Sequence, residues 1–276
     1  MNSKKIVLTF LTVLISLMIF SQEVVYIDEN LQSIDALAYS KKCKLEAFKC
    51  NLYEVDSLII YKVLPKFNFG KIDETAYNQI RKLLMRDTQE EITPNKTLII
   101  KFYDTIFPYK TAFKNHVKHM ETVHNVSVDS NETVNIKHAS FNEESFNKSR
   151  EKFVVKSNKC LKKFEDRFNS EIFYMVDEDN GITHEYSNFN WVIDNGFFKN
   201  NFFKFRSHYG TVFIKPDGEF FLIGSHFSDS SAKKLLKDTD WSKHKNDWQK
   251  TLTNKSNKSY GIFKTNVANG HYEHCF

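Results

Sequence analysis

The sequence predicts an α/β domain, with parallel strands at the centre of its sheet and an antiparallel hairpin at one edge. From residue 97 onward, short apolar runs alternate with longer stretches whose apolar residues recur at helical spacing. The runs at 97–103 and 171–176 are apolar almost throughout, as are strands buried on both faces. A Pro-Asp-Gly turn at 216–218 joins two further short runs, which predicts the hairpin.

A small leading region, residues 23–94, is expected before this domain. Residues 57–63 are rich in β-branched and aromatic side chains, which favours a strand. Asp73 then stands where an N-cap is needed, ahead of a stretch with helical spacing. The apolar residues of that predicted helix fall on one face and are Tyr77, Ile80, Leu83 and Leu84.

The α/β domain is expected to span residues 95–240, beginning with the strand at 97–103. The spacing predicts a helix over 111–122, and the polar stretch 125–140 is predicted to be a loop or an extra hairpin. A long amphipathic helix is predicted over 143–168 and leads to the strand at 171–176. The domain therefore begins as strand, helix, insertion, helix and strand.

Helical spacing returns over 188–205 and predicts another helix there. The hairpin strands follow at 211–214 and 219–223, and a helix begins near Ser230. Residues 241–276 are expected to form a last helix and a tail. In that helix Trp241 and Trp248 fall on one face and would pack it onto the domain.

Composition excludes several classes of protein. The chain has 276 residues, of which 41% are hydrophobic and 26% charged, and these proportions are typical of a folded globular protein. Its 8 glycines are too far apart for a dinucleotide-binding G-x-G-x-x-G loop or a P-loop. The net charge of +5 is mild and spread along the chain, so no nucleic-acid partner is expected.

The first 22 residues indicate export. Lys4 and Lys5 precede an apolar run that ends at Phe20 and is followed by the small residue Ser21. This is the pattern of a signal peptide, and the run is shorter than the roughly 20 residues that a membrane-spanning helix needs. We expect a periplasmic or secreted protein without stable membrane insertion after cleavage. An uncleaved anchor is the alternative.

Four cysteines follow this segment: Cys43, Cys50, Cys160 and Cys275. In an oxidising compartment four cysteines allow three pairings. Cys43 and Cys50 are close in sequence, which favours a local disulfide and leaves Cys160 with Cys275. Free buried thiols are the alternative. The chain contains no C-x-x-C, which also excludes zinc sites built from paired C-x-x-C motifs.

Other residues with chemical potential have ordinary structural explanations. His116, His119 and His124 could approach a metal from one helix, and the tail over 271–276 holds two further histidines and a cysteine. We favour solvated histidines and a plain tail, and assign no metal, no cofactor and no catalytic residue. The aromatic group Phe197, Phe198, Phe202, Phe203 and Phe205 is interpreted as core, with a partner-binding surface as the alternative.

Two segments carry a family resemblance. Residues 101–110 (KFYDTIFPYK) and 210–218 (GTVFIKPDG) lie in the order and surroundings of two conserved parts of the thioredoxin-like fold. In this respect the chain resembles exported thiol-disulfide oxidoreductases and peroxiredoxin-like proteins. The first segment is similar to that family's strand and active-site turn, and the second to its cis-proline strand and hairpin. The resemblance implies a three-layer domain with a site where these segments meet.

The resemblance also implies that this site has lost its redox chemistry. Phe107 and Lys110 stand at the two cysteine positions, with Pro108 and Tyr109 between them, and Gly210 stands at the cis-proline position. Thiol exchange needs a thiolate, which neither phenylalanine nor lysine supplies.

We therefore expect a non-catalytic binding or structural role. A groove near Phe107, Lys110, His208 and Gly210 would hold a protein or peptide partner, and an adhesin-like or stress-related interaction protein fits the same description. The alternative is a thiol-disulfide oxidoreductase or peroxidase-type enzyme that uses Cys160 or the pair Cys43 and Cys50.

Overall fold

The computed structural model describes residues 23–55, 58–124, 134–136, 139–179, 186, 189, 191–203, 210–254, 256–264 and 275–276. The expected signal segment, residues 1–22, lies outside them. The chain forms two compact units. The smaller contains residues up to Lys66 together with Lys250–Ser259, and the larger contains Phe67–Gln249 and Tyr260–Phe276. The fold is mixed α/β, as the sequence predicts at this coarse level.

The smaller unit is a three-stranded sheet with one helix. Its strands are β1 (Glu23–Ile27), β2 (Phe48–Val55) and β3 (Leu58–Pro65), in the order β1-β3-β2. β1 runs parallel to β3, and β2 runs antiparallel to it. Helix α2 (Ala36–Cys43) begins after its N-cap Asp35. Tyr39 of α2 contacts the rings of Tyr26 and Tyr61, which fixes the helix on the sheet.

The larger unit is built on a six-stranded sheet in the order β4-β11-β10-β5-β8-β9. The strands are β4 (Phe67–Lys71), β5 (Thr97–Thr105), β8 (Ser170–Glu178), β9 (Trp191–Ile193), β10 (Thr211–Ile214) and β11 (Glu219–Ile223). β5, β8 and β9 are mutually parallel. On the other side of β5, β10 runs antiparallel to β5, β11 to β10 and β4 to β11. β4 belongs to this sheet, although its residues were expected in the leading region, and it lies outside β11, so the β10-β11 hairpin is not at an edge, contrary to the prediction.

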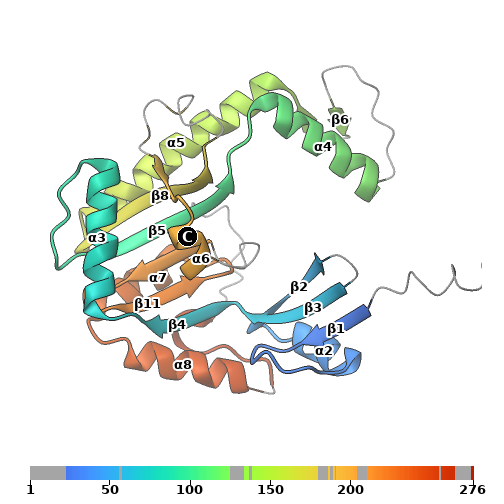
Figure 1. Ribbon diagram of the computed structural model, residues 1–276, viewed down its shortest axis with the longest axis horizontal. Helices are drawn as coiled ribbons and strands as arrows, with labels where there is room; N and C mark the ends of the chain where they lie inside the picture. Colours follow the sequence, from blue (N-terminus) through green and yellow to red (C-terminus); the bar gives the residue numbers. More distant parts are fainter. Residues whose placement is uncertain are drawn as a thin grey trace, which may run out of the picture. The chain divides into compact units, whose positions relative to one another are not determined.

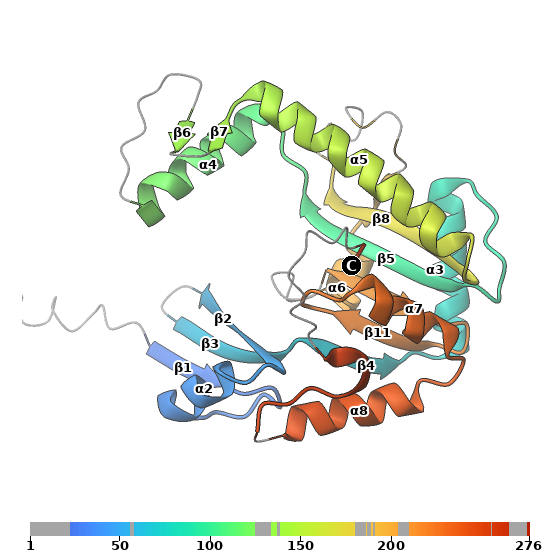
Figure 2. The same ribbon diagram turned by 180° about the vertical axis from the view of Figure 1, so that it is seen from behind.

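Helices cover both faces of this sheet. The helices from α3 onward are α3 (Glu74–Thr88), α4 (Tyr109–His124), α5 (Glu143–Glu165), α6 (Phe197–Asn201), α7 (Asp229–Lys237) and α8 (Ser242–Thr253), of which α4 extends away from the sheet. Figures 1 and 2 show α3 and α6 on one face, and α5 and α7 on the other. We call these the α3 face and the α5 face. Helix α3 starts at its expected cap, because Asp73 accepts a hydrogen bond from the Ala76 amide.

The two faces differ in the side chains they bury. Alternation along β5 sends Leu98, Ile100 and Phe102 to the α3 face, where they join an apolar core with α3 and α6. The intervening residue Lys101 therefore points to the α5 face. Its neighbour across the parallel pair is Tyr174 of β8. A lysine thus lies on the buried face of a central strand.

Helices α4 and α5 form an arm at one end of the sheet (Figure 2). The short hairpin β6 (Val134–Ile136) and β7 (Ala139–Phe141) lies between them in the chain, as one of the two sequence alternatives predicts. Phe141 is the hub of the arm, since its ring lies 4.7 Å from His116 and 6.1 Å from both Tyr109 and Phe146. Aromatic packing therefore supports α4 on its inner side.

The helix predicted over 188–205 is wrong. Residues Trp191–Ile193 form strand β9, which pairs with β8, and among the described residues of this stretch only those of α6 are helical. Asn195 and Gly196 adopt left-handed backbone angles, with φ of 49° and 86°, which interrupt any continuous helix. The Asp194 carboxylate then accepts the amides of Phe198 and Lys199 and starts α6.

The C-terminal region differs from the expectation in one detail. Trp248 lies in α8 and packs edge-on against Phe67, 5.3 Å between ring centres, as its predicted role requires. Trp241 precedes α8 instead of lying within it. It is nevertheless 1% exposed, and its indole N–H donates to the Leu235 carbonyl of α7. The two tryptophans therefore anchor different elements.

Candidate functional site

The turn singled out in the sequence lies between β5 and α4. Strand β5 ends at Thr105 and α4 begins at Tyr109, so residues 107–110 span the start of the helix. The Pro108 carbonyl accepts the first helical hydrogen bond, from the Ala112 amide at 2.9 Å. Proline is favourable here because its ring sets φ near the helical value. Phe107 is 42% exposed, and Lys110 is exposed as well.

Gly210 lies beside the strand that leads into this turn. Its amide donates to the Ile223 carbonyl, and its carbonyl accepts from the Phe102 amide at 2.8 Å. Gly210 therefore continues β10 by one residue between β5 and β11. A β-carbon at this position would not clash, since it would lie 4.0 Å from the Phe102 carbonyl oxygen, an ordinary van der Waals distance. His208, which the sequence analysis places in the same groove, lies outside the described residues.

The four cysteines form two disulfides, Cys43–Cys50 and Cys160–Cys275. This is the pairing that the sequence favours, and no cysteine is left as a free thiol. The first disulfide joins α2 to β2 within the smaller unit. The second joins α5 to the segment Cys275–Phe276, 115 residues further along the chain. Cys160 and Cys275 are only 3% and 4% exposed.

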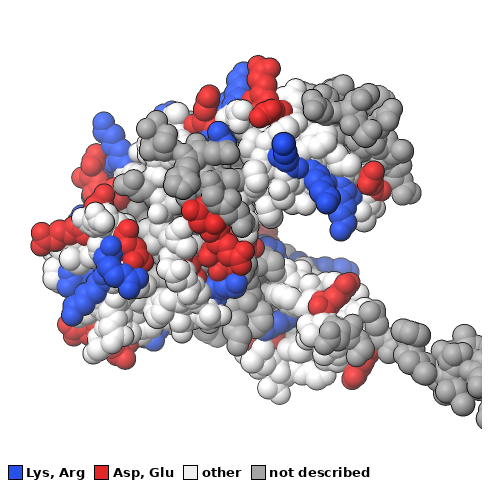
Figure 3. Space-filling model, turned by 45° about the horizontal axis from the view of Figure 1, so that its top comes forward, with Lys and Arg blue, Asp and Glu red and all other residues white. Residues whose placement is uncertain are grey.

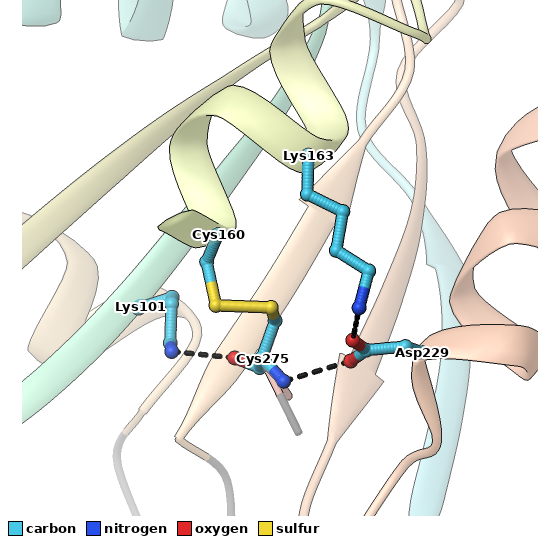
Figure 4. Close-up of a disulfide and its surroundings, with 5 residues drawn as sticks. All are labelled: Lys101, Cys160, Lys163, Asp229 and Cys275. Atoms are coloured by element: carbon cyan, nitrogen blue, oxygen red, sulfur yellow. Dashed lines mark hydrogen bonds and ion pairs between the residues drawn. A yellow bond between two sulfur atoms is a disulfide. The ribbon is translucent and has the colours of Figure 1, made fainter. Parts of the chain in front are cut away.

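Polar groups surround the Cys160–Cys275 disulfide (Figure 4). The Lys101 ammonium donates to the Cys275 carbonyl at 2.5 Å, and the Cys275 amide donates to Asp229 Oδ1 at 2.7 Å. Asp229 is the first residue of α7 and also pairs with Lys163 of α5. Three elements of the α5 face thus converge on one residue near the end of the chain.

Burial changes the acid-base properties of Lys101. Loss of solvent, helped by the nearby Lys156, lowers its pKa from 10.5 to about 8, while Asp229 opposes the change. The ammonium lies 4.9 Å from the centre of the Tyr174 ring, whose negative face attracts a cation. Burial also raises the pKa of the Tyr174 hydroxyl to about 12. Lys101 is therefore a partly neutral amine near pH 8.

Neither Lys101 nor Asp229 was predicted from the sequence as a site residue. The available signal was a charged residue inside the apolar run TLIIKFY, because a buried strand rarely carries a lysine without a reason. The reason lies far away in sequence, since the Cys275 carbonyl is 174 residues from Lys101. Spacing alone could not identify this partner.

A row of basic side chains follows the outer side of α4. Lys110, Lys114 and Lys118 recur at every fourth residue and are all exposed. Figure 3 shows basic side chains following one another over this helix. The next acidic residue along the helix is Glu121. Together with the exposed Phe107 ring at the start of the helix, these residues define a surface that we call the α4 surface.

The histidines and the phenylalanine group that the sequence offers as further candidates have different surroundings. No group of three or more potential metal ligands occurs in the described parts of the chain. His116 stacks on Phe141, while the side chain of His124 and residues 271–274 lie outside those parts. Phe198, Phe202 and Phe203 are buried in the core and Phe197 is exposed, whereas Phe205 is not among the described residues.

Comparison with models of known protein families, with curated proteins and with solved structures found no match. Among the helices described here, none combines the length and apolar character needed to cross a bilayer.

Proposed function

We propose that this chain is an exported binding protein with a thioredoxin-like fold, whose site at the start of α4 holds a protein or peptide partner and has no thiol chemistry. The observation that carries the proposal is the turn itself. Phe107 and Lys110 occupy the positions at which the thioredoxin-like pattern requires cysteines, and the helix begins there as that pattern requires. A thiol-free turn in this position cannot exchange disulfides.

Topology supports the thioredoxin-like part of the proposal. The run β5-α4-α5-β8 returns to a parallel neighbour, and the antiparallel hairpin β10-β11 lies on the other side of β5, followed by α7. This strand arrangement is the one that the resemblance implies. The two disulfides support export, because such bonds persist in oxidising compartments.

The α4 surface supports the binding part of the proposal. An exposed aromatic side chain contributes contact area, and neighbouring positive charges attract an oppositely charged partner and orient it. Phe107 and the three lysines offer these two features within one helix length. The partner that fits this surface is an acidic segment of a peptide or protein that also carries an apolar side chain to pack against Phe107.

Assays of insulin reduction and peroxide consumption test the absence of thiol chemistry. We expect both rates to equal the uncatalysed rates, because all four cysteines are in disulfides and those at 160 and 275 are buried. Turnover that disappears in Cys160→Ser or Cys43→Ser would instead establish the alternative, an oxidoreductase or peroxidase-type enzyme.

Selection of a random peptide library on the immobilised full chain tests binding. We expect acidic peptides to be enriched, and their affinity to fall by about tenfold or more in Lys110→Glu/Lys114→Glu/Lys118→Glu, because reversed charges repel them. The matched control is Lys234→Glu/Lys237→Glu/Lys243→Glu, which makes the same charge change at exposed positions on α7 and α8. Equal losses in both variants, or no acidic enrichment, would contradict the proposal.

A further inference from the structure

The segment Cys275–Phe276 is held on the α5 face in the way that a binding site holds a peptide. Its Cys275 amide donates to Asp229, its Cys275 carbonyl accepts from Lys101, and a main-chain oxygen of Phe276 accepts from the Phe227 amide at 3.4 Å. These three contacts engage only the main chain of the segment. They would therefore be available to any peptide of similar shape.

One side chain of the segment is also recognised. The Phe276 ring lies 4.9 Å from the Phe164 ring and 5.0 Å from the Phe213 ring, and both contacts are edge-to-face. Phe164 and Phe213 are themselves completely buried. Edge-to-face packing between rigid neighbours favours an aromatic residue at this position. The site thus combines main-chain recognition with an aromatic slot.

The buried charge of Lys101 favours the state in which the segment is bound. Within the described residues, Lys101 forms no ion pair; the nearby Asp229 is committed to Lys163 and to the Cys275 amide. The ammonium is satisfied by a peptide carbonyl and by the Tyr174 and Phe276 rings. Removal of the segment would take away the carbonyl and the Phe276 ring and leave the buried cation only the Tyr174 ring, which is costly unless water or another acceptor replaces the lost partners.

We propose that Cys275–Phe276 is a plug, locked by the Cys160–Cys275 disulfide in a second peptide-binding site, and that reduction of this bond opens the site to a peptide segment containing an aromatic residue. Asp229, Lys101 and the Phe227 amide would bind the main chain of that peptide. Phe164 and Phe213 would bind its aromatic ring. This proposal does not depend on the α4 surface, and the two can fail separately.

The opening step is a thiol-disulfide exchange with a dithiol. A thiolate of the dithiol attacks one sulfur of the Cys160–Cys275 bond, and the other sulfur leaves as a thiolate that takes up a proton. The second thiol of the reagent then displaces the protein sulfur from the mixed disulfide. The dithiol ends as a disulfide, and the protein gains two thiols. Because both cysteines are buried, a transient local opening must expose one of the sulfurs before the attack can occur.

The reactivity of the Lys101 amine measures whether the site is open. We would treat the full-length Cys275→Ser/Phe276→Ala variant briefly with the succinimidyl ester of acetic acid and follow each lysine by peptide mass spectrometry. Lys101 is expected to be acetylated about tenfold faster than in the intact protein, as a difference in opening free energy of about 1.4 kcal/mol produces. Lys215 serves as an internal reference, since its ion pairs with Asp217 and Glu219 lie in the β10-β11 hairpin.

Two probe peptides then test recognition. Acetyl-Ser-Phe amide should protect Lys101 in this variant and return its acetylation rate toward that of the intact protein, because it restores the main-chain contacts and fills the slot. Acetyl-Ser-Ala amide lacks the ring and should not protect. The same measurements on the unmodified protein reduced with dithiothreitol provide a second route to the open site, in case the double variant does not fold.

Three results would overturn the proposal. Lys101 could react no faster after the plug is released, which would mean that other groups cover it. Lys215 could accelerate together with Lys101, which would make the disulfide a general structural cross-link. Equal protection by the two peptides, or protection by neither, would exclude an aromatic-specific site.

Discussion

The two faces of the six-stranded sheet are stabilised in different ways. On the α3 face, Leu98, Ile100 and Phe102 meet apolar residues from α3 and α6 in one hydrophobic core cluster. On the α5 face, the same strand presents Lys101, next to a disulfide and an ion pair. Hydrophobic burial dominates the α3 face, whereas the α5 face also depends on a buried lysine, an ion pair and a disulfide.

This difference indicates where the fold can change without unfolding. Removing any group from a close-packed apolar face lowers the free energy of unfolding, so such a face keeps one arrangement. A face completed by a short segment through one disulfide and a few hydrogen bonds can lose that segment and keep the rest. The proposed opening of the Cys160–Cys275 disulfide would therefore act on the α5 face and leave the α3 face intact.

The largest expected effect is on the α3 face. Phe203 is fully buried and stacks on Phe102 with 4.7 Å between ring centres. Phe203→Ala should lower the free energy of unfolding by about 3–5 kcal/mol, as a lost aromatic side chain and a cavity do. Phe197→Ala, at an exposed position of the same aromatic group, should change it by less than about 1 kcal/mol.

Urea denaturation followed by circular dichroism measures both variants, with and without a thiol reductant. The loss in Phe203→Ala should be the same in both conditions, because burial on the α3 face does not involve the disulfide. A loss that depends on the reductant would show that the two faces are not independent.

The second effect is on the α5 face. Cys160→Ser/Cys275→Ser should lower the free energy of unfolding by about 2–4 kcal/mol, because a bond that closes a loop of 115 residues strongly restricts the unfolded chain. The control Cys43→Ser/Cys50→Ser removes a bond between residues only 7 apart and should cost less. The same urea experiment checks both pairs. An equal cost for the two would contradict the loop-length argument.

The third effect is a dependence of stability on pH that belongs to Lys101. The folded state lowers the pKa of this amine to about 8 from 10.5, so the unfolded chain binds its proton more tightly. The free energy of unfolding should therefore rise with pH between these two values, by about 2 kcal/mol from pH 8 to 10. Below pH 8 the penalty for the buried charge is fully present.

Lys101→Met removes the titrating amine and keeps a side chain of similar length. Urea denaturation between pH 8 and 10 should therefore give a flatter profile in this variant than in the unmodified protein. Above pH 10 burial acts in the opposite direction through Tyr174, whose raised pKa of about 12 makes the unfolded state lose its proton first. A profile unchanged by Lys101→Met would assign the dependence to other groups.

The sequence predicted the elements whose determinants are local. The cap at Asp73, the apolar side of α3, the strand at β5 and the turn between β10 and β11 are each specified within a few residues. The helix after β5 was expected over 111–122 and is found as α4, which begins two residues earlier, directly after a proline that suits a helix N-terminus. These features were correct because no distant partner is needed to produce them.

The features that were missed depend on distant contacts. β9 has three residues and exists as a strand through its pairing with β8, while its apolar spacing also fits a helix. The surroundings of Lys101 require Cys275 and Asp229, which lie 174 and 128 residues away in the chain. A single sequence contains no local pattern for such a cluster, so its site could not be predicted.

The smallest effect concerns how α3 is positioned on its face. Asp73 accepts the Ala76 amide at 2.7 Å, and this bond satisfies one of the amides that a helix start leaves unpaired. Asp73→Ala should lower the free energy of unfolding of the larger unit by about 1 kcal/mol, and Asp73→Asn should recover most of it because the amide oxygen also accepts. Asp35 caps α2 with the same geometry, accepting the Ala38 amide at 2.8 Å, but α2 buries no residue completely. Asp35→Ala should therefore leave the urea transition of the larger unit unchanged, and a shift of that transition would show that the caps act beyond their own units.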